Sequence, residues 1–215
     1  MKDSSNDKPI LQFKADDVTV SKLETKYQGF FKLNQYQLSH KLFSGLQSQG
    51  ITREVFERGD AVVVLLYDAK LDKILLIEQF RPGAIRTCAG TVSKSPWQLE
   101  FIAGMFEEHE SPIEVAIREA KEEANIDIKA NNITPIMQYL SSPGGMSETI
   151  HLYLAKINSE DVEVGSVFGL AHENEDILLH LISRVEALEL LSQGKITNAA
   201  TIIGLQWLAM HYQTL

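Results

Sequence analysis

The stretch Gly104-Met-Phe-Glu-Glu-His-Glu-Ser-Pro-Ile-Glu-Val-Ala-Ile-Arg-Glu-Ala-Lys-Glu-Glu-Ala-Asn-Ile126 contains the clearest local structural signals in this chain. Ser111 is a favourable helix N-cap, Pro112 suits the first helical position, and Glu114 completes a Ser-x-x-Glu capping box. Asn125 stands where a helix commonly ends in a left-handed residue. We therefore predict a helix over residues 112–124.

The predicted helix has an apolar face and an acidic face. Its apolar residues recur at helical spacing and should pack against a core; they are Ile113, Ala116, Ile117, Ala120 and Ala124. Glu119, Glu122 and Glu123 stand at positions i, i+3 and i+4, so their carboxylates crowd together. Arg118 and Lys121 balance only part of that charge.

The crowded carboxylates allow two interpretations. A run of Glu on a surface helix is usually a solvated face. Alternatively, a bound cation relieves the repulsion, and hard oxygens without nearby Cys or His suit Mg²⁺ or Mn²⁺ rather than zinc. The three glutamates alone leave both interpretations open.

The order of residues in this stretch resembles the Nudix box, whose signature is Gly-x5-Glu-x7-Arg-Glu-U-x-Glu-Glu-x-Gly-U, with U a bulky aliphatic residue. Two positions depart from it: Ala120 is smaller than the usual U, and Asn125, which tolerates positive φ, replaces the last Gly. The resemblance implies a Nudix hydrolase whose carboxylates bind Mg²⁺. The matching positions are Gly104, Glu110, Arg118, Glu119, Glu122, Glu123 and Ile126.

The composition of the whole chain is that of an ordinary globular protein, with 215 residues, 44% hydrophobic and 23% charged. The net charge of −9 argues against general affinity for nucleic acid or an anionic membrane. Cys88 is the single cysteine, which fits a reducing cytoplasm. Met1 to Asp7 is polar and no apolar run is long enough to span a bilayer, so we expect neither a signal peptide nor a membrane span.

Residues 1–58 are predicted to form a small antiparallel β module. Polar and apolar residues alternate between Val18 and Arg58, interrupted by turns at Ser44-Gly45 and Gln49-Gly50. A module of about three strands is small to stand alone, so it should pack on the rest of the chain or on a second subunit.

Residues 59–215 are predicted to form the main domain. Arg86 to Pro96 is expected to be an excursion loop, and Asn158 to Glu175 a long acidic loop of functional or mobile character. Two helices close the chain, one opened by a Ser183 capping box and one running from about Asn198 to Gln213. The expected strands are 61–67, 73–80, 97–101, 136–140, 149–157 and 176–182.

Strands on both sides of one helix, followed by a helical pair, predict an α/β protein. We expect a mixed-sheet α/β/α sandwich with a small N-terminal antiparallel β module, which is also the Nudix fold that the resemblance implies.

Beyond the box, further segments resemble the ADP-ribose pyrophosphatase branch of the Nudix family. The most specific are Ser-Pro-Gly-Gly-Met-Ser-Glu148 and Glu173-Asn-Glu-Asp176. The matching segments are 27–31, 53–59, 77–81, 100–105, 142–148, 169–176 and 194–200.

The resemblance implies a role for each of several residues. Glu173 would be the catalytic base, although by composition alone its segment is equally a polar loop. The metal ligands would be the Ala103 carbonyl, Glu119, Glu123 and Glu175, with Glu122 binding directly or through water. Gly104, Glu110 and Arg118 would hold the box together. Substrate would be bound by Phe30, Phe31, Arg53, Glu54, Arg58, Arg81, Met105, Ser142, Gly144 and Glu148.

The aromatic pair Phe30 and Phe31 has a simpler alternative role in core packing. The resemblance instead implies that they stack on adenine from the other subunit of a homodimer. The implied reaction is Mg²⁺-dependent hydrolysis of ADP-ribose to AMP and ribose 5-phosphate, with Mn²⁺ as a substitute. The alternatives are a GDP-mannose-type pyrophosphatase and a non-catalytic domain that senses ADP-ribose.

Overall fold

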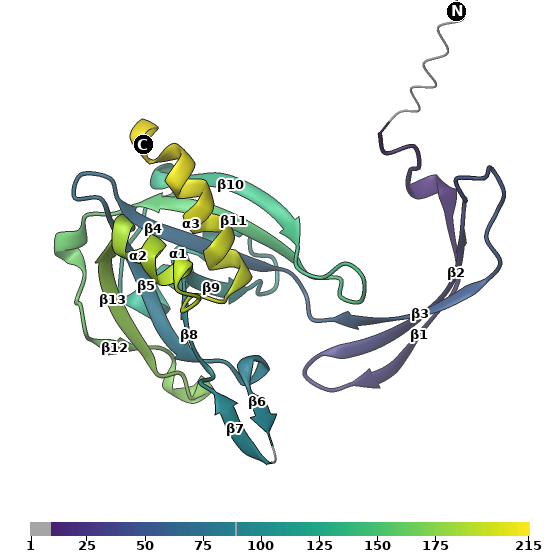
Figure 1. Cartoon of the computed structure of the whole chain (residues 1–215), viewed down its shortest axis with the longest axis horizontal. Helices are drawn as coiled ribbons and strands as arrows, with labels where there is room; N and C mark the ends of the chain where they lie inside the picture. Colours follow the sequence, from purple (N-terminus) through teal and green to yellow (C-terminus); the bar gives the residue numbers. More distant parts are fainter. Residues whose placement is uncertain (1–9, 89) are drawn as a thin grey trace, which may run out of the picture. The chain divides into compact units, whose positions relative to one another are not determined.

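The computed structural model describes residues 10–88 and 90–215. Met1 to Asp7, on which the expected absence of a signal peptide was argued, lies outside the described residues, as does the start of the 1–58 module. The chain divides into two compact units (Figure 1). The first ends at Arg58 and includes Ser142–Ser147, which the sequence analysis assigned to the second domain. The second comprises Gly59–Ser141 and Glu148–Leu215.

The first unit is a three-stranded antiparallel sheet in the order β1-β2-β3. After the short helix η1 (Ala15–Asp17), its strands are β1 (Val18–Gln28), β2 (Lys32–His40) and β3 (Ile51–Glu57). Among its described residues Asn34 alone is buried, so this part of the chain has no apolar core of its own. The expectation that the module packs on the rest of the chain or on a second subunit stays a prediction.

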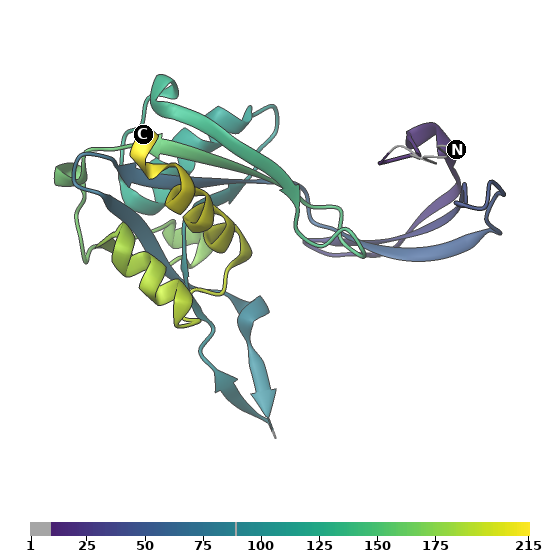
Figure 2. The same cartoon turned by 45° about the horizontal axis from the view of Figure 1, so that its top comes forward.

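The second unit is built on an eight-stranded mixed sheet (Figure 2). β4 pairs in parallel with β11, whereas its pairings with β5 and β9 are antiparallel. The main path is β10 (Ile133–Leu140), β11 (Thr149–Lys156), β4 (Ala61–Asp68), β5 (Lys73–Phe80), β13 (Ile177–Ser183) and β12 (Val167–Phe168). β8 (Trp97–Glu100) pairs with β5, and β9 (Ile102–Met105) pairs with β4.

Helices cover both faces of this sheet. Alternate residues of β4 point to opposite faces, as the period of a strand requires: Val62 and Val64 join the core beneath α1 (Pro112–Ala124), and Val63 and Leu65 join the other. The second core is covered by α2 (Arg184–Ser192) and α3 (Ala199–His211). The predicted α/β/α sandwich is confirmed.

Several local expectations were wrong. The segment 86–96 contains a hairpin of β6 (Arg86–Cys88) and β7 (Thr91–Lys94). Its described strand residues are all exposed, so the sequence has no alternation of buried and exposed residues that would predict it. The loop after β11 contains η4 (Ser159–Asp161), β12 and η5 (Ala171–Glu173). β10 begins earlier than expected, and the last helix stops at His211 before η6 (Tyr212–Thr214). The remaining short helices are η2 (Pro82–Ala84) and η3 (Ala130–Asn132).

None of the helices within the described ranges is long and apolar enough to cross a membrane.

Candidate active site

The helix α1 begins and ends as its sequence predicts. The Ser111 hydroxyl accepts a hydrogen bond from the Glu114 amide, and the Glu114 carboxylate accepts one of 2.8 Å from the Ser111 amide. Asn125 has a left-handed φ of 54°. The predicted apolar face was partly wrong, because Val115 is fully buried whereas Ile113 is 37% exposed.

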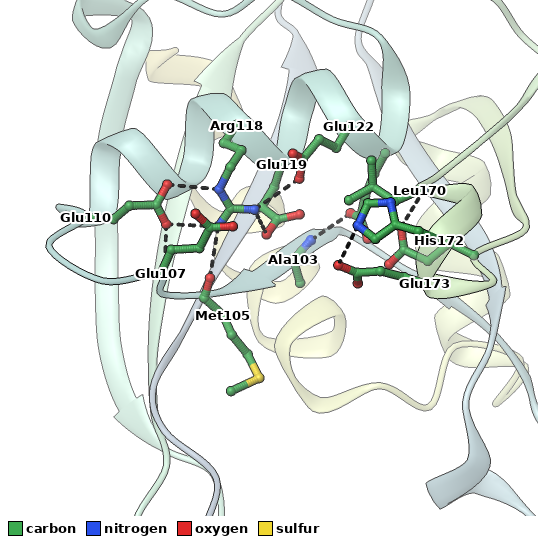
Figure 3. Close-up of polar contacts among 12 residues, drawn as sticks. Ala103, Met105, Glu107, Glu110, Arg118, Glu119, Glu122, Leu170, His172 and Glu173 are labelled. Atoms are coloured by element: carbon green, nitrogen blue, oxygen red, sulfur yellow. Dashed lines mark hydrogen bonds and ion pairs between the residues drawn. The ribbon is translucent and has the colours of Figure 1, made fainter. Parts of the chain in front are cut away.

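Arg118 forms ion pairs with three carboxylates, those of Glu110, Glu119 and Glu122 (Figure 3). It donates to both oxygens of Glu110 at 2.9 Å and, through Nη2, to the Met105 carbonyl at 3.0 Å. Its Nη1 donates to Glu119 at 2.6 Å and to Glu122 at 3.0 Å. The hydrogen bond from Arg118 lowers the pKa of Glu110. Arg118 therefore ties the loop before α1 to the helix itself.

Gly104 gives the Glu119 carboxylate the space it occupies. A Cβ on residue 104 would lie 1.5 Å from Glu119 Oε1, far inside van der Waals contact. The backbone of β9 and the carboxylate thus pack directly against each other, and only a residue without a side chain fits.

Glu119 and Glu123 are buried, so the solvated-face interpretation is wrong for them: their exposed fractions are 8% and 2%. Burial raises the pKa of Glu119 to about 7, despite Arg118, and the charges of Glu122 and Glu175 add to the rise.

Burial likewise raises the pKa of Glu123 well above its ordinary value, and the charge of Glu119 adds to that rise. The Ala103 amide, which donates to Glu123 at 3.0 Å, and the positive charge of Arg81 oppose it. Burial is thus the larger cause of both raised pKa values, and repulsion between neighbouring carboxylates is the smaller one.

The donor chemistry of this group fits a hard divalent cation, because it offers carboxylate oxygens and a strand backbone in a buried, negatively charged setting. Within residues 10–88 and 90–215, no three His, Cys, Asp or Glu side chains form a ready-made metal cluster. Glu119 and Glu122 instead bind Arg118. Metal binding would require these two carboxylates to share their oxygens with the cation or turn toward it.

The loop carrying Glu173 and Glu175 approaches the same carboxylates from the other side. Figure 3 shows η5, with His172 and Glu173, beside Ala103 and across from Arg118. Glu175 accepts a 3.0 Å hydrogen bond from the Leu170 amide, and its charge reaches Glu119 and Glu123. The Glu173 side chain is 56% exposed, with His172 Nε2 3.7 Å away.

Two predicted substrate residues of the second unit are held by neighbours. Arg81 donates through Nε to Glu100 Oε2 at 2.8 Å, and its Nη2 forms an ion pair with the same oxygen at 2.8 Å. Glu148 is buried and accepts a 2.6 Å hydrogen bond from the Ser141 hydroxyl. These contacts fix the orientations of the Arg81 and Glu148 side chains. Met105, the third predicted substrate residue of this unit, is half-buried.

The predicted residues of the first unit divide into anchored and exposed side chains. Phe31 packs edge-on against Phe56 at 5.2 Å, with the Arg58 guanidinium 5.4 Å from its ring centroid. Phe30 touches Phe31 at 4.7 Å yet is 87% exposed, which leaves its ring face open for stacking. The other predicted residues here are exposed: Arg53, Glu54, Ser142 and Gly144.

The fold is that of a Nudix hydrolase, and the carboxylates of α1 lie within the segment that the family model matches. The chain belongs to the Nudix family, since the model of the NUDIX domain matches residues 57–196. Over 203 residues it is 44% identical to the ADP-ribose pyrophosphatase of Escherichia coli strain K12, covering 94% of this chain and 93% of that protein. It is 43% identical over 206 residues to the ADP-ribose pyrophosphatase of Haemophilus influenzae, covering 96% of this chain and 92% of that protein.

More distant proteins share the fold. The GDP-mannose pyrophosphatase of Yersinia enterocolitica is 31% identical over 186 residues, covering 86% of this chain and 91% of that protein. A crystal structure of an ADP compounds hydrolase aligns with a TM-score of 0.64 at 20% identity, covering 92% of this chain and 95% of that chain. At that identity the structural similarity concerns the fold alone.

Proposed function

We propose that this protein hydrolyses the diphosphate linkage of ADP-ribose to AMP and ribose 5-phosphate in a Mg²⁺-dependent reaction. One observation carries the proposal: the buried Glu119 and Glu123 of α1 lie within electrostatic reach of Glu175, on the loop that also carries the exposed Glu173. The ADP-ribose pyrophosphatases that are 43–44% identical to it over most of their length support this choice of substrate.

The carboxylates would hold the divalent cations together with the Ala103 carbonyl. Glu119, Glu123 and Glu175 are the proposed ligands, and Glu122 binds directly or through water. When bound, such ions neutralise diphosphate charge and lower the pKa of the attacking water.

Glu173 is the proposed general base. Its carboxylate is exposed and so can reach a water molecule over the site. The water oxygen forms a bond to one phosphorus as the bond from that phosphorus to the bridging oxygen breaks, and the water proton passes to Glu173. Glu173→Gln should lower kcat by about 100-fold or more, the range of general base catalysis, without lowering Tm.

The substrate residues are proposed from the resemblance of their segments to ADP-ribose pyrophosphatases. Phe30 stacks on adenine, a contact worth on the order of 1–3 kcal/mol, with Phe31 behind it. Arg81 contacts a phosphate or the terminal ribose, and Glu148 orients a hydroxyl group. Arg53, Glu54, Arg58, Met105, Ser142 and Gly144 complete the proposed set.

A homodimer in the cytoplasm completes the proposal. The described part of the first unit buries no apolar side chain, so a second copy would supply the surface that a three-stranded sheet needs. A single cysteine suits a reducing compartment.

A substrate panel tests the function. ADP-ribose, GDP-mannose, NADH and diadenosine polyphosphates are each incubated with the protein and Mg²⁺, and products are separated by chromatography. AMP and ribose 5-phosphate formed fastest from ADP-ribose would support the proposal. Faster turnover of GDP-mannose would contradict the substrate choice, and binding of ADP-ribose without turnover at any Mg²⁺ concentration would indicate a sensor.

A further inference from the structure

The segment 194–200 between α2 and α3 has no role in the chemistry described so far. Its Asn198 is the N-cap of α3, and the side-chain Oδ1 accepts hydrogen bonds from the Thr201 amide at 3.0 Å and the Thr201 hydroxyl at 3.1 Å. The other end of the same amide, Nδ2, donates to Glu100 Oε1 at 3.0 Å. Asn198 therefore serves two neighbours at once.

Both oxygens of Glu100 are occupied. Oε1 accepts from Asn198, and Oε2 accepts from Arg81 and, at 3.3 Å, from Gln79 Nε2. Glu100 is only 4% exposed, so water cannot easily replace these donors. The hydrogen bond from Asn198 fixes the orientation of the Glu100 carboxylate, and Glu100 Oε2 is therefore held in place as the acceptor for Arg81.

Arg81 extends from this anchor toward the carboxylate site. Its amide donates to the Pro96 carbonyl at 3.0 Å, while its side chain remains 41% exposed. A guanidinium has five N–H donors, and the bonds to Glu100 leave several free for an anionic oxygen. The charge of Arg81 is also close enough to act on the buried Glu123.

We propose that Asn198 and Glu100 are positioning residues that orient the Arg81 guanidinium for the substrate diphosphate. This inference rests on the proposed function, in which Arg81 contacts substrate. The N-cap of α3 thereby sets the geometry of a binding group through Glu100, which lies 98 residues earlier in the sequence.

Cap function and positioning can be separated because Ser is also a good N-cap. Asn198→Ser keeps an acceptor for Thr201 but removes the amide donor to Glu100. We expect kcat/KM to fall about tenfold, mostly through KM, which is the cost of losing a hydrogen bond to a charged group, and Tm to fall as well because the buried Glu100 loses a donor. Asn198→Asp also keeps the cap but sets a second carboxylate against Glu100, so the loss should be larger.

Ser183→Ala is the matched control. It weakens the N-cap of α2, where the Ser183 hydroxyl accepts from the Glu186 amide at 3.1 Å, without touching Glu100. This variant should lower Tm and leave KM unchanged. A similar KM effect in both variants would show that helix capping, not positioning, is responsible.

The decisive experiment is a double-mutant cycle of Arg81→Ala with Asn198→Ser, assayed on the substrate that wild type hydrolyses fastest. If Asn198 acts through Arg81, Asn198→Ser has no further effect in the Arg81→Ala background. Equal effects in both backgrounds would overturn the inference. Because the substrate is chosen by experiment, failure of ADP-ribose as substrate is a separate result.

A second readout does not depend on turnover. The Arg81 Nε–H proton, assigned by its loss in Arg81→Lys, should give a slowly exchanging NMR signal in wild type. It should broaden or exchange faster in Asn198→Ser. An unchanged signal would contradict the positioning role whatever the substrate proves to be.

Discussion

Two arginines of the second unit each bind carboxylates, but with opposite electrostatic results. Arg184 forms a two-point pair with Asp72, at 2.9 and 2.8 Å, and lies 3.5 Å over the ring of Tyr212. Burial raises the pKa of Asp72, but hydrogen bonds from Arg184 and Tyr67 outweigh this, and the pKa is lowered. Arg118 must instead serve Glu110, Glu119 and Glu122.

The difference lies first in burial, which is the larger cause of the raised pKa values of Glu119 and Glu123, and then in the ratio of charges. One cation and one anion at Arg184 make a balanced pair that ties the β4–β5 turn to the start of α2. At Arg118 the pKa of Glu119 rises to about 7, and that of Glu123 is raised well above its ordinary value. A balanced pair serves the fold, whereas surplus negative charge kept in a buried site indicates a place for a cation.

The largest expected effect is on catalysis, from Glu123→Gln. The amide keeps an acceptor for Ala103 but lacks the charge to hold a divalent ion, whose charge stabilisation is worth several kcal/mol. We expect kcat for ADP-ribose to fall by roughly 10³-fold at saturating Mg²⁺, with Tm unchanged or higher. Steady-state kinetics and thermal unfolding check this. A near-normal kcat would show that Glu123 does not hold a catalytic ion.

Gly104→Ala tests the same site through shape rather than charge. The new methyl would meet the Glu119 carboxylate at 1.5 Å and displace it. A displacement of about 1 Å in a catalytic site costs roughly 10²-fold in rate, so we expect kcat to fall by that factor. Gly50→Ala is the control, because a Cβ there meets nothing within 4 Å and the backbone has no positive φ. Equal kcat in the two variants would contradict the account.

Glu119→Gln should change how stability depends on pH in the presence of a chelator. The folded pKa of about 7 lies above the ordinary 4.5, so ionising Glu119 costs stability. That cost is absent below the unfolded pKa and grows as pH rises toward the folded one. The shift corresponds to about 3 kcal/mol at most. Urea unfolding measures the free energy of unfolding at these pH values. As pH rises, this free energy should fall in wild type relative to Glu119→Gln, and an identical pH dependence in the two proteins would contradict the prediction.

Asp72→Asn should have the smallest effect, with the opposite pH dependence. The lowered pKa means that Asp72 stabilises the fold above its unfolded pKa of 3.8 and loses this as pH falls through the folded pKa. The Asp72 side chain is 39% exposed, so solvent screens its charge. We therefore expect Asp72→Asn to lower the free energy of unfolding by only about 1 kcal/mol at pH 7. Denaturant unfolding at neutral and acid pH measures it, and kcat should not change.

Local signals predicted the parts of this protein that depend on neighbouring residues. Ser111, Glu114 and Asn125 specified the ends of α1 because capping involves residues three or four apart. The exposed β6–β7 hairpin was missed because a strand pattern reports burial. The spacing placed Glu119, Glu122 and Glu123 on one helix, but not the sharing of Arg118 among them.

Contacts between residues far apart in the sequence could not be predicted from the spacing of residues along the chain. The parallel pairing of β4 with β11 joins segments separated by the whole of α1, and periodicity within a strand does not name its partner. Glu100 and Asn198 both fall in segments that resemble the family, yet nothing in the spacing indicated that they meet.

The most direct test of the surplus-charge account is a Mn²⁺ titration followed by electron paramagnetic resonance of the free ion. Wild type and Asp72→Asn should bind Mn²⁺ equally, because Arg184 and Asp72 form a balanced pair. Glu119→Gln should bind at least roughly 10-fold more weakly, because losing a ligand should cost no less than losing a residue that orients one. Equal binding by all three proteins would show that the α1 carboxylates are not the metal site and would contradict the account.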